Sequence, residues 1–388
     1  MKQFIIFLAT LAGLFVVMTG PAAANDVGKP GAQRTHASTD GLPLAQKAGA
    51  LAQALGKPRR FLIGLGTVPA TEVLARQIRV DIYDQYINGV GTDSWINWNR
   101  PPGAYVKVVT DQADALRAVP MFTLYQMAAR GDSDLSGLTD RVFMADYWRN
   151  VRILYAGLAK YGKPALVNFE PDFWGYTQRI HSDPNRHFVH VRGNKDCADL
   201  PDSVVGMATC LVQMARNLAP NAYVGFPPSL FGDLRRTEPD YMQKIGAARA
   251  DFVVMQTADR DAGCLEAESV PDHCKRPGAG GYWDESNQTT PNFVEHFVLA
   301  RKYHLALQLP LLWWQTPLGL PAAKPSSQPP WRDNRVRYFL THPDQLIAAG
   351  GMGVVFSSGG PTQTNLQTDK GQFLTLSRSY LARPAALP

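Results

Sequence analysis

The chain of 388 residues lacks several features that would assign it quickly to a functional class. After its first 24 residues it has no apolar run of the roughly 20 residues that a membrane-spanning helix needs. Its formal charge of +6 is spread thinly, and no basic groove with interleaved aromatic residues is visible. We therefore expect no nucleic acid partner and no stable membrane insertion of the mature chain.

Motifs for cofactors, metals and serine nucleophiles are also missing. No GxGxxG follows the first predicted strand, no CxxC pair supports a zinc site, and Ser357 lies in no GxSxG elbow. The run Asp132-Ser133-Asp134 begins like a calcium loop but lacks the later glycine and glutamate. We predict no cofactor and no metal.

The first 24 residues have the order of a secretory signal peptide. Lys2 precedes an apolar run from Phe4 to Met18, and small residues follow at Ala22-Ala23-Ala24. We expect a secreted or periplasmic protein. Residues 25–58, rich in Gly, Pro, Ser and Ala, are predicted to form a loosely ordered leader, and residues 59–388 a single domain.

Cysteine is scarce, with only four residues in the chain. An even number in an exported protein favours disulfides, and three pairings are open. Because each neighbouring pair brackets one loop-like insertion, we favour Cys197 with Cys210 and Cys264 with Cys274.

From Arg59 onward, short apolar runs typical of strands alternate with amphipathic helical stretches. The predicted strands are 61–66, 78–83, 120–125, 165–169, 222–226, 252–256, 307–313 and 353–357. Eight such units predict a parallel sheet covered on both faces and closed into a (β/α)8 TIM barrel, an α/β fold. A doubly wound open sheet is the alternative. The long segments 172–202 and 259–289 would then rise from the C-terminal face of the barrel, where barrel active sites are built.

Carboxylates follow several of these strands. Glu170 and Asp172 end strand four, and two positions apart on extended backbone they would point to the same side. Their aromatic neighbours favour a raised carboxyl pKa, which a general acid at neutral pH requires. Asp84 after strand two and Asp259 after strand six are the other candidates. Each of the four has a simpler alternative as a loop, capping or ion-paired residue.

Seven of the eight tryptophans lie at strand ends or in the loops that follow them. Flat aromatic rings exposed in a cleft stack on sugar rings, although the core is the alternative for any single Trp. Gln and Ser side chains at strand ends are suited to hydrogen bonds with hydroxyl groups. The predicted substrate-binding residues are Trp95, Trp98, Trp174, Tyr176, Trp313, Trp314, Gln315, Tyr86, Gln256 and Ser357.

Together, the eight βα units, the acid after strand four and the strand-end tryptophans resemble the (β/α)8 glycoside hydrolases. In the largest clan of these, strand four ends Asn-Glu-Pro and strand seven ends in a nucleophilic Glu. The resemblance implies that Glu170 is the acid/base, although Phe169 separates it from Asn168 and Gln315 stands where strand seven would carry its Glu. The Glu170-x-Asp172 pair is also similar, in reversed order, to the DxE pair of chitinase-like barrels.

The sequence therefore predicts a monomeric glycosidase for a polysaccharide or an envelope or matrix glycan, with Glu170 as general acid. Asp84 or Asp259 would act as the base of an inverting mechanism, and Asp172 would orient Glu170. Two alternatives stay open. One is a non-catalytic carbohydrate-binding protein on the same barrel, which the absent strand-seven Glu favours, and the other is a periplasmic accessory factor that holds a protein partner.

Overall fold

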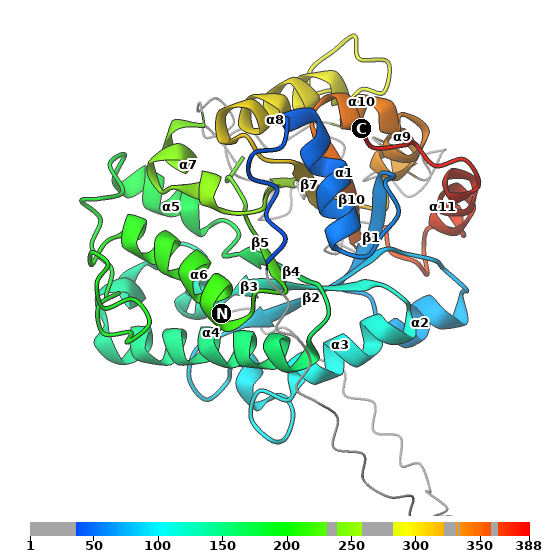
Figure 1. Cartoon of the computed structure of the whole chain (residues 1–388). Coiled ribbons are helices and arrows are strands. Elements are labelled where there is room, and N and C mark those ends of the chain that lie inside the picture. Colours follow the sequence, from blue (N-terminus) through cyan, green and yellow to red (C-terminus); the bar gives the residue numbers. More distant parts are fainter. Residues whose placement is uncertain (1–35, 231–238, 258–281, 322–330, 333, 358–363) are drawn as a thin grey trace, which may run out of the picture. The chain divides into compact units, whose positions relative to one another are not determined.

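The computed structural model describes residues 36–230, 239–257, 282–321, 331–332, 334–357 and 364–388 (Figure 1). Within these residues eight parallel strands close into a barrel in the order β1-β10-β7-β6-β5-β4-β3-β2. The strands are β1 (Leu62–Gly66), β2 (Ile82–Asn88), β3 (Val119–Tyr125), β4 (Ala165–Phe169), β5 (Ala222–Phe226), β6 (Phe252–Gln256), β7 (Leu311–Pro317) and β10 (Gly351–Ser357). The predicted (β/α)8 barrel is confirmed.

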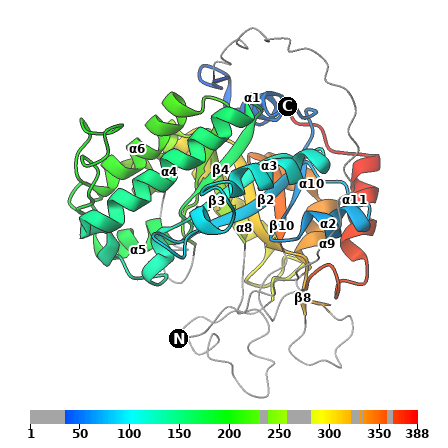
Figure 2. The same cartoon turned by 90° about the horizontal axis from the view of Figure 1, so that it is seen from below.

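Helices surround the strands, and Figure 2 shows α4 and α6 running side by side over one flank of the barrel. The two-residue strands β8 (Leu320–Pro321) and β9 (Trp331–Arg332) pair with each other outside it. The helices are α1 (Leu44–Ala54), α2 (Ala70–Ala75), α3 (Tyr105–Ala115), α4 (Arg141–Tyr161), α5 (Phe173–Ile180), α6 (Val204–Leu218), α7 (Asp240–Lys244), α8 (Phe293–Leu307), α9 (Arg335–Thr341), α10 (Pro343–Ala348) and α11 (Gln372–Ala382).

Strands β2 and β7 end later than the sequence predicts. Residues 84–88 belong to β2 because they pair in register with residues 121–125 of β3. Helix α8 extends to Leu307, where the sequence predicted the start of β7, and it ends at Gln308 with a left-handed φ of 57°. The later ends of β2 and β7 add Asp84, Tyr86 and Gln315 to the C-terminal edge of the barrel.

Part of the predicted leader is ordered. Residues 44–54 form helix α1, so the prediction of a loosely ordered segment is wrong there. The helix is amphipathic, because Ala48, Leu51, Ala52 and, directly after it, Leu55 recur at helical spacing and are buried.

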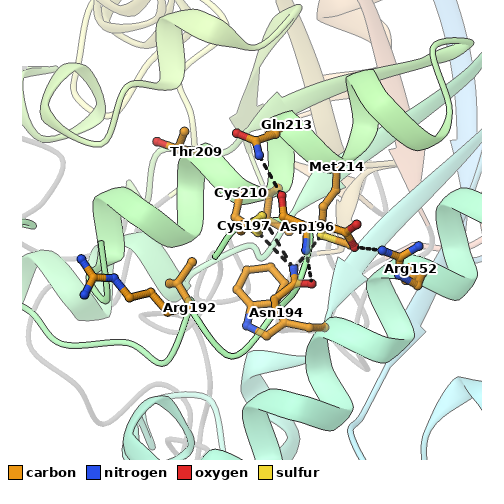
Figure 3. The surroundings of a disulfide bond; sticks show 12 residues. Arg152, Arg192, Asn194, Asp196, Cys197, Thr209, Cys210, Gln213 and Met214 are labelled. Atoms are coloured by element: carbon orange, nitrogen blue, oxygen red, sulfur yellow. Dashed lines mark hydrogen bonds and ion pairs between the residues drawn. A yellow bond between two sulfur atoms is a disulfide. The ribbon is translucent and has the colours of Figure 1, made fainter. Parts of the chain in front are cut away.

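A disulfide joins Cys197 to Cys210, which confirms one of the two predicted pairs (Figure 3). It ties the long segment between α5 and α6 to helix α6 itself. The Asn194 amide points at both sulfurs, with Nδ2 3.3 Å from Cys210 Sγ, and contacts Met214 Sδ at 3.2 Å. Cys264 and Cys274 lie outside the described residues. In the part of the chain that the structure describes, no helix is both long and apolar enough to cross a membrane.

Candidate functional site

The C-terminal ends of the strands bring polar side chains together inside the barrel. Asp84 on β2 accepts hydrogen bonds from Thr123 Oγ1 on β3 at 2.8 Å and from Trp314 Nε1 on β7 at 2.9 Å. Strands β2 and β7 are not neighbours in the barrel, so the bond to Trp314 crosses its interior. A glycine on β1 makes room for the carboxyl, since a Cβ on Gly66 would lie 2.9 Å from Asp84 Oδ2.

The Asp84 carboxyl is buried and has only uncharged hydrogen-bond donors. Burial raises its pKa to about 7, because the charged form loses its hydration, while the Trp314 and Thr123 hydrogen bonds oppose that shift. Near neutral pH both protonation states are therefore populated. Asp84 faces the interior of the barrel from the end of β2, which also carries Tyr86.

Half-buried polar side chains lie beside this carboxyl. Gln315 Nε2 donates to the Tyr86 hydroxyl at 3.0 Å, and Gln256 Nε2 lies 3.5 Å from Gln315 Oε1. The Tyr86 ring contacts Trp314 with ring centroids 5.7 Å apart. These four predicted binding residues therefore meet at the ends of β2, β6 and β7, with amide and hydroxyl groups suited to a polar ligand.

Backbone strain is concentrated at these strand ends. Glu170, Asp172 and Gln315 have positive φ angles of 49°, 67° and 53°, a region that residues other than glycine rarely adopt. At Gln315 this conformation breaks the alternation of the strand, so that its side chain and that of Trp314 both face the interior. Strain of this kind tends to occur at functional sites, where the surrounding structure holds it.

The left-handed backbone also overturns one sequence prediction. Glu170 and Asp172 do not lie on extended backbone, so their side chains are not set on one side by strand alternation. Glu170 is fully buried, and its Oε2 accepts hydrogen bonds from the backbone N–H groups of Gln126 and Met127 at 3.0 and 2.9 Å. Its Oε1 has no hydrogen-bond partner among the described residues.

Burial raises the pKa of Glu170 to about 8. The backbone amides of Gln126 and Met127 and the Tyr147 hydroxyl, which faces the carboxyl from α4, oppose this shift without cancelling it. At neutral pH the carboxyl therefore carries a proton. The sequence-based expectation of a raised pKa at this position is met, although burial by many neighbours causes it.

Asp172 lies in a different environment, half-buried at the start of α5. Burial raises the pKa of Tyr125 at the end of β3, and the charges of Asp172 and Tyr176 act in the same direction. The Tyr125 hydroxyl donates to Asp132 at 3.0 Å. These residues form a polar group beside the ends of β3 and β4. Asp259, the remaining predicted carboxylate, lies outside the described residues.

Four of the five tryptophans predicted to bind substrate are buried, and one of them is Trp314, which lies inside the barrel against Asp84. Trp313 packs on helices α8 and α9 outside the barrel and donates to His296 Nε2 at 2.8 Å. Trp174 donates to the Phe169 carbonyl at 2.8 Å, and Trp95 is fully buried. By contrast, Trp98 is 43% exposed and contacts the Tyr105 ring edge-on, with centroids 5.0 Å apart.

Several residues of this region have no strong sequence signal. Gln126 follows β3, and its side-chain Oε1 accepts from Trp95 Nε1 at 3.0 Å and from Asn150 Nδ2 at 2.8 Å. Asn150 and Tyr147 lie on the buried face of α4, where polar residues within an apolar periodicity were the only available indication. Ser357, by contrast, was predicted from the sequence; it is buried at the end of β10, and its hydroxyl has no partner among the described residues.

The described residues contain no group of three or more His, Cys, Asp or Glu side chains able to hold a metal ion. The described side chains at the C-terminal end of the barrel offer carboxyl, amide and hydroxyl groups. A neutral carboxyl in a dry environment can donate a proton, and a second carboxyl with a pKa near 7 can accept one.

No protein-family model matches the chain, and no curated protein sequence does. Solved structures match it in fold. The catalytic domain of a GH26 endo-β-1,4-mannanase from Bacillus sp. JAMB-750 has a TM-score of 0.50 and 10% identity, covering 90% of this chain and 92% of that one. A modular endo-β-1,4-mannanase from Cellulomonas fimi has a TM-score of 0.51 and 12% identity, covering 88% and 74%. The chain therefore shares the (β/α)8 fold of these glycoside hydrolases.

Proposed function

We propose that the protein is a glycoside hydrolase that cleaves a polysaccharide or an envelope or matrix glycan at the C-terminal end of its barrel. One observation carries the proposal. Burial raises the pKa of Glu170, the carboxyl at the end of β4, to about 8, so it carries a proton near neutral pH. A neutral carboxylic acid is the group that glycosidic bond cleavage needs to protonate the leaving oxygen.

In this proposal Glu170 is the proton donor, and a second carboxyl completes the chemistry. Asp84 suits the role of a base, because its pKa of about 7 leaves part of the population ionised at neutral pH. Asp172 would adjust the field near Glu170 from the start of α5. Asp259 stays a prediction for the same role as Asp84.

Sugar binding would use the polar residues at the strand ends. Tyr86, Gln256 and Gln315 offer hydroxyl and amide groups for the hydroxyls of a glycan. The exposed ring of Trp98 offers a face for a sugar ring. The two mannanases that share the fold support carbohydrate as the substrate class, and the Cys197–Cys210 disulfide supports an oxidising compartment.

Carbohydrate binding without cleavage is the second candidate. It is favoured by Gln315, an amide at the end of β7 where the resemblance calls for a carboxylate, and by the complete burial of Glu170. A binding protein needs the polar strand ends but no proton donor. The accessory-factor hypothesis has no specific observation in its favour.

A panel of glycans tests these candidates, with reducing-end release and binding both measured. We expect the wild-type protein to bind and cleave at least one glycan, and Glu170→Gln to lose about 10²- to 10⁴-fold in release while it still binds. Glu72→Gln on α2 is the matched control and keeps wild-type release. Near-normal turnover in Glu170→Gln removes the proposed role of Glu170, and binding without release in the wild type favours the second candidate.

A further inference from the structure

We propose that Gln126, Trp95 and Asn150 form a positioning unit that holds the Glu170 carboxyl through the backbone of Gln126. The inference rests on the proposed function, because the orientation of Glu170 matters for cleavage only if that carboxyl donates the proton. It assigns a task to three buried residues that do not themselves contact Glu170 through their side chains.

Gln126 connects the parts of this unit. Its backbone N–H donates to Glu170 Oε2 at 3.0 Å, and the next N–H, that of Met127, donates to the same oxygen at 2.9 Å. Its side-chain Oε1 accepts two hydrogen bonds, from Trp95 Nε1 and from Asn150 Nδ2. The Gln126 side chain is therefore held by two donors, while the backbone N–H of Gln126 donates to the Glu170 carboxyl.

The two donors come from different elements. Trp95 begins the short 3-10 helix η1 (Trp95–Asn97) in the connection between β2 and α3, and Asn150 lies in the middle of α4. Gln126, Asn150, Trp95 and Glu170 all have 0% exposure. Because the interior is close-packed and dry, each of these hydrogen bonds is strong, and the loss of a single donor leaves a buried acceptor short of a partner.

The unit sets the charge of Glu170 as well as its place. Hydrogen bonds from the two amides favour the ionised carboxyl, so they limit how far burial raises its pKa. Among the described residues, the titratable group that faces the Glu170 carboxyl is Tyr147, which lies one turn before Asn150 on α4. The backbone N–H groups of Gln126 and Met127 approach the carboxyl from the side of β3. If Gln126 moves, the hydrogen bonds from the backbone N–H groups of Gln126 and Met127 to Glu170 weaken. The Glu170 carboxyl then becomes harder to ionise.

Two substitutions remove one donor each. Trp95→Phe deletes the indole N–H and keeps an aromatic ring in the core, while Asn150→Leu replaces the amide by an apolar group of similar volume. Trp148→Phe is the matched control. Trp148 is also buried and also donates through Nε1, but its partner is the His190 carbonyl at 2.9 Å, away from Gln126.

The readout is the titration of the Glu170 carboxyl by carbon-13 NMR of the full-length folded protein, with its signal identified as the one absent from Glu170→Gln. We expect the pKa of Glu170 to rise by about 0.5 to 1 unit, about three- to tenfold in proton affinity, in Trp95→Phe and Asn150→Leu. Trp148→Phe should titrate like the wild type. A general loss of packing would move the control as well.

Activity gives the second readout. If a glycan is cleaved, the alkaline limb of kcat should shift upward by the same amount in the two variants and stay in place in the control. If the wild type cleaves no glycan, the proposed function fails, and the NMR titration still decides whether the unit controls Glu170. An unchanged Glu170 titration in folded Trp95→Phe and Asn150→Leu overturns the inference, and so does an equal shift in Trp148→Phe.

Discussion

Buried carboxyl groups have charged hydrogen-bond partners at the N-terminal end of the barrel and uncharged ones at the C-terminal end. At the N-terminal end, Asp81 precedes β2 and accepts two hydrogen bonds from Arg60, each 2.8 Å long. Asp251 precedes β6 and accepts two from Arg216, at 2.9 and 3.0 Å. At the C-terminal end, Asp84 and Glu170 are held by uncharged groups.

This contrast separates stability from chemistry. A carboxyl with a bidentate guanidinium partner accepts two charge-assisted hydrogen bonds, and here these bonds tie neighbouring strands together. Asp251 also accepts from His36 Nε2 and from the Val224 backbone N–H, which fastens the described start of the chain to β5 and β6. A buried carboxyl without a cation stays neutral and available for proton transfer. In barrel enzymes generally, the C-terminal face carries the active site.

The largest effect is expected at the N-terminal end. Asp251→Ala should lower the free energy of unfolding by about 3 kcal/mol, because it leaves the Arg216 guanidinium and the Val224 N–H without their acceptor. Urea unfolding measures the loss. Asp111→Ala, which breaks the exposed pair with Lys107, is the control and should cost less than about 0.5 kcal/mol. Equal losses of unfolding free energy in the two variants would contradict the claim that the buried Asp–Arg pairs at the N-terminal end of the barrel stabilise the fold more than an exposed pair does.

A similar loss is expected from the disulfide, which adds a stabilising element on the loop side of the barrel. Replacing Cys197 and Cys210 by alanine frees a loop with a sequence separation of 13 residues, which should cost about 3 kcal/mol of unfolding free energy. The titration of Glu170 should not change, because the bridge lies between the α5–α6 segment and α6. A shifted Glu170 pKa would show that this loop shapes the site.

The next prediction uses pH to separate the two ends. Since the pKa values of Asp84 and Glu170 are raised in the folded state, folding retains protons that the unfolded chain has released above about pH 4 to 4.5. Stability should therefore fall as pH rises, from about pH 5 to about 7 for Asp84 and to about 8 for Glu170. Each group contributes a slope of about 1.4 kcal/mol per pH unit in its window.

Asp84→Asn and Glu170→Gln should each flatten the profile in the matching window, while wild-type stability at pH 5 is kept. The measurement is the free energy of unfolding in urea at a series of pH values. A wild-type profile that rises between pH 5 and pH 8 would contradict the proposed neutral carboxyls.

The smallest effect is expected from Glu170→Gln at pH 5, where the wild type has not yet lost stability through this carboxyl. The amide is close in shape to the protonated carboxyl and still accepts from the N–H groups of Gln126 and Met127, so stability should change by less than about 0.5 kcal/mol. Glu170→Ala should cost about 1 to 3 kcal/mol, because both buried N–H groups lose their acceptor. A costly Gln variant would mean that the wild-type carboxyl is ionised.

The barrel was accessible from sequence because its signal is periodic and local. Strands β4, β5 and β6 begin and end at the predicted residues, where apolar runs are bounded by polar or small residues. Asp84, Tyr86 and Trp314 were also identifiable, since a barrel brings the ends of all its strands to one face.

The contacts within the candidate site could not be predicted from the sequence. The positive φ angles of Glu170 and Gln315 depend on tertiary packing, and they redirect side chains that strand alternation would place elsewhere. The same holds for Trp313, whose ring packs on α8 and α9, and for the bonds from Trp95 and Asn150 to Gln126. Such contacts join residues far apart in the chain, and no local pattern records them.

The most direct test of the account is infrared spectroscopy of the folded protein at pH 6, where ordinary Asp and Glu side chains are ionised. Protonated carboxyls give a separate C=O stretching band. The account predicts such bands in the wild type, with one component lost in Glu170→Gln and another in Asp84→Asn. Absence of a protonated-carboxyl band at pH 6, or a band that survives in both Glu170→Gln and Asp84→Asn at full strength, would contradict it.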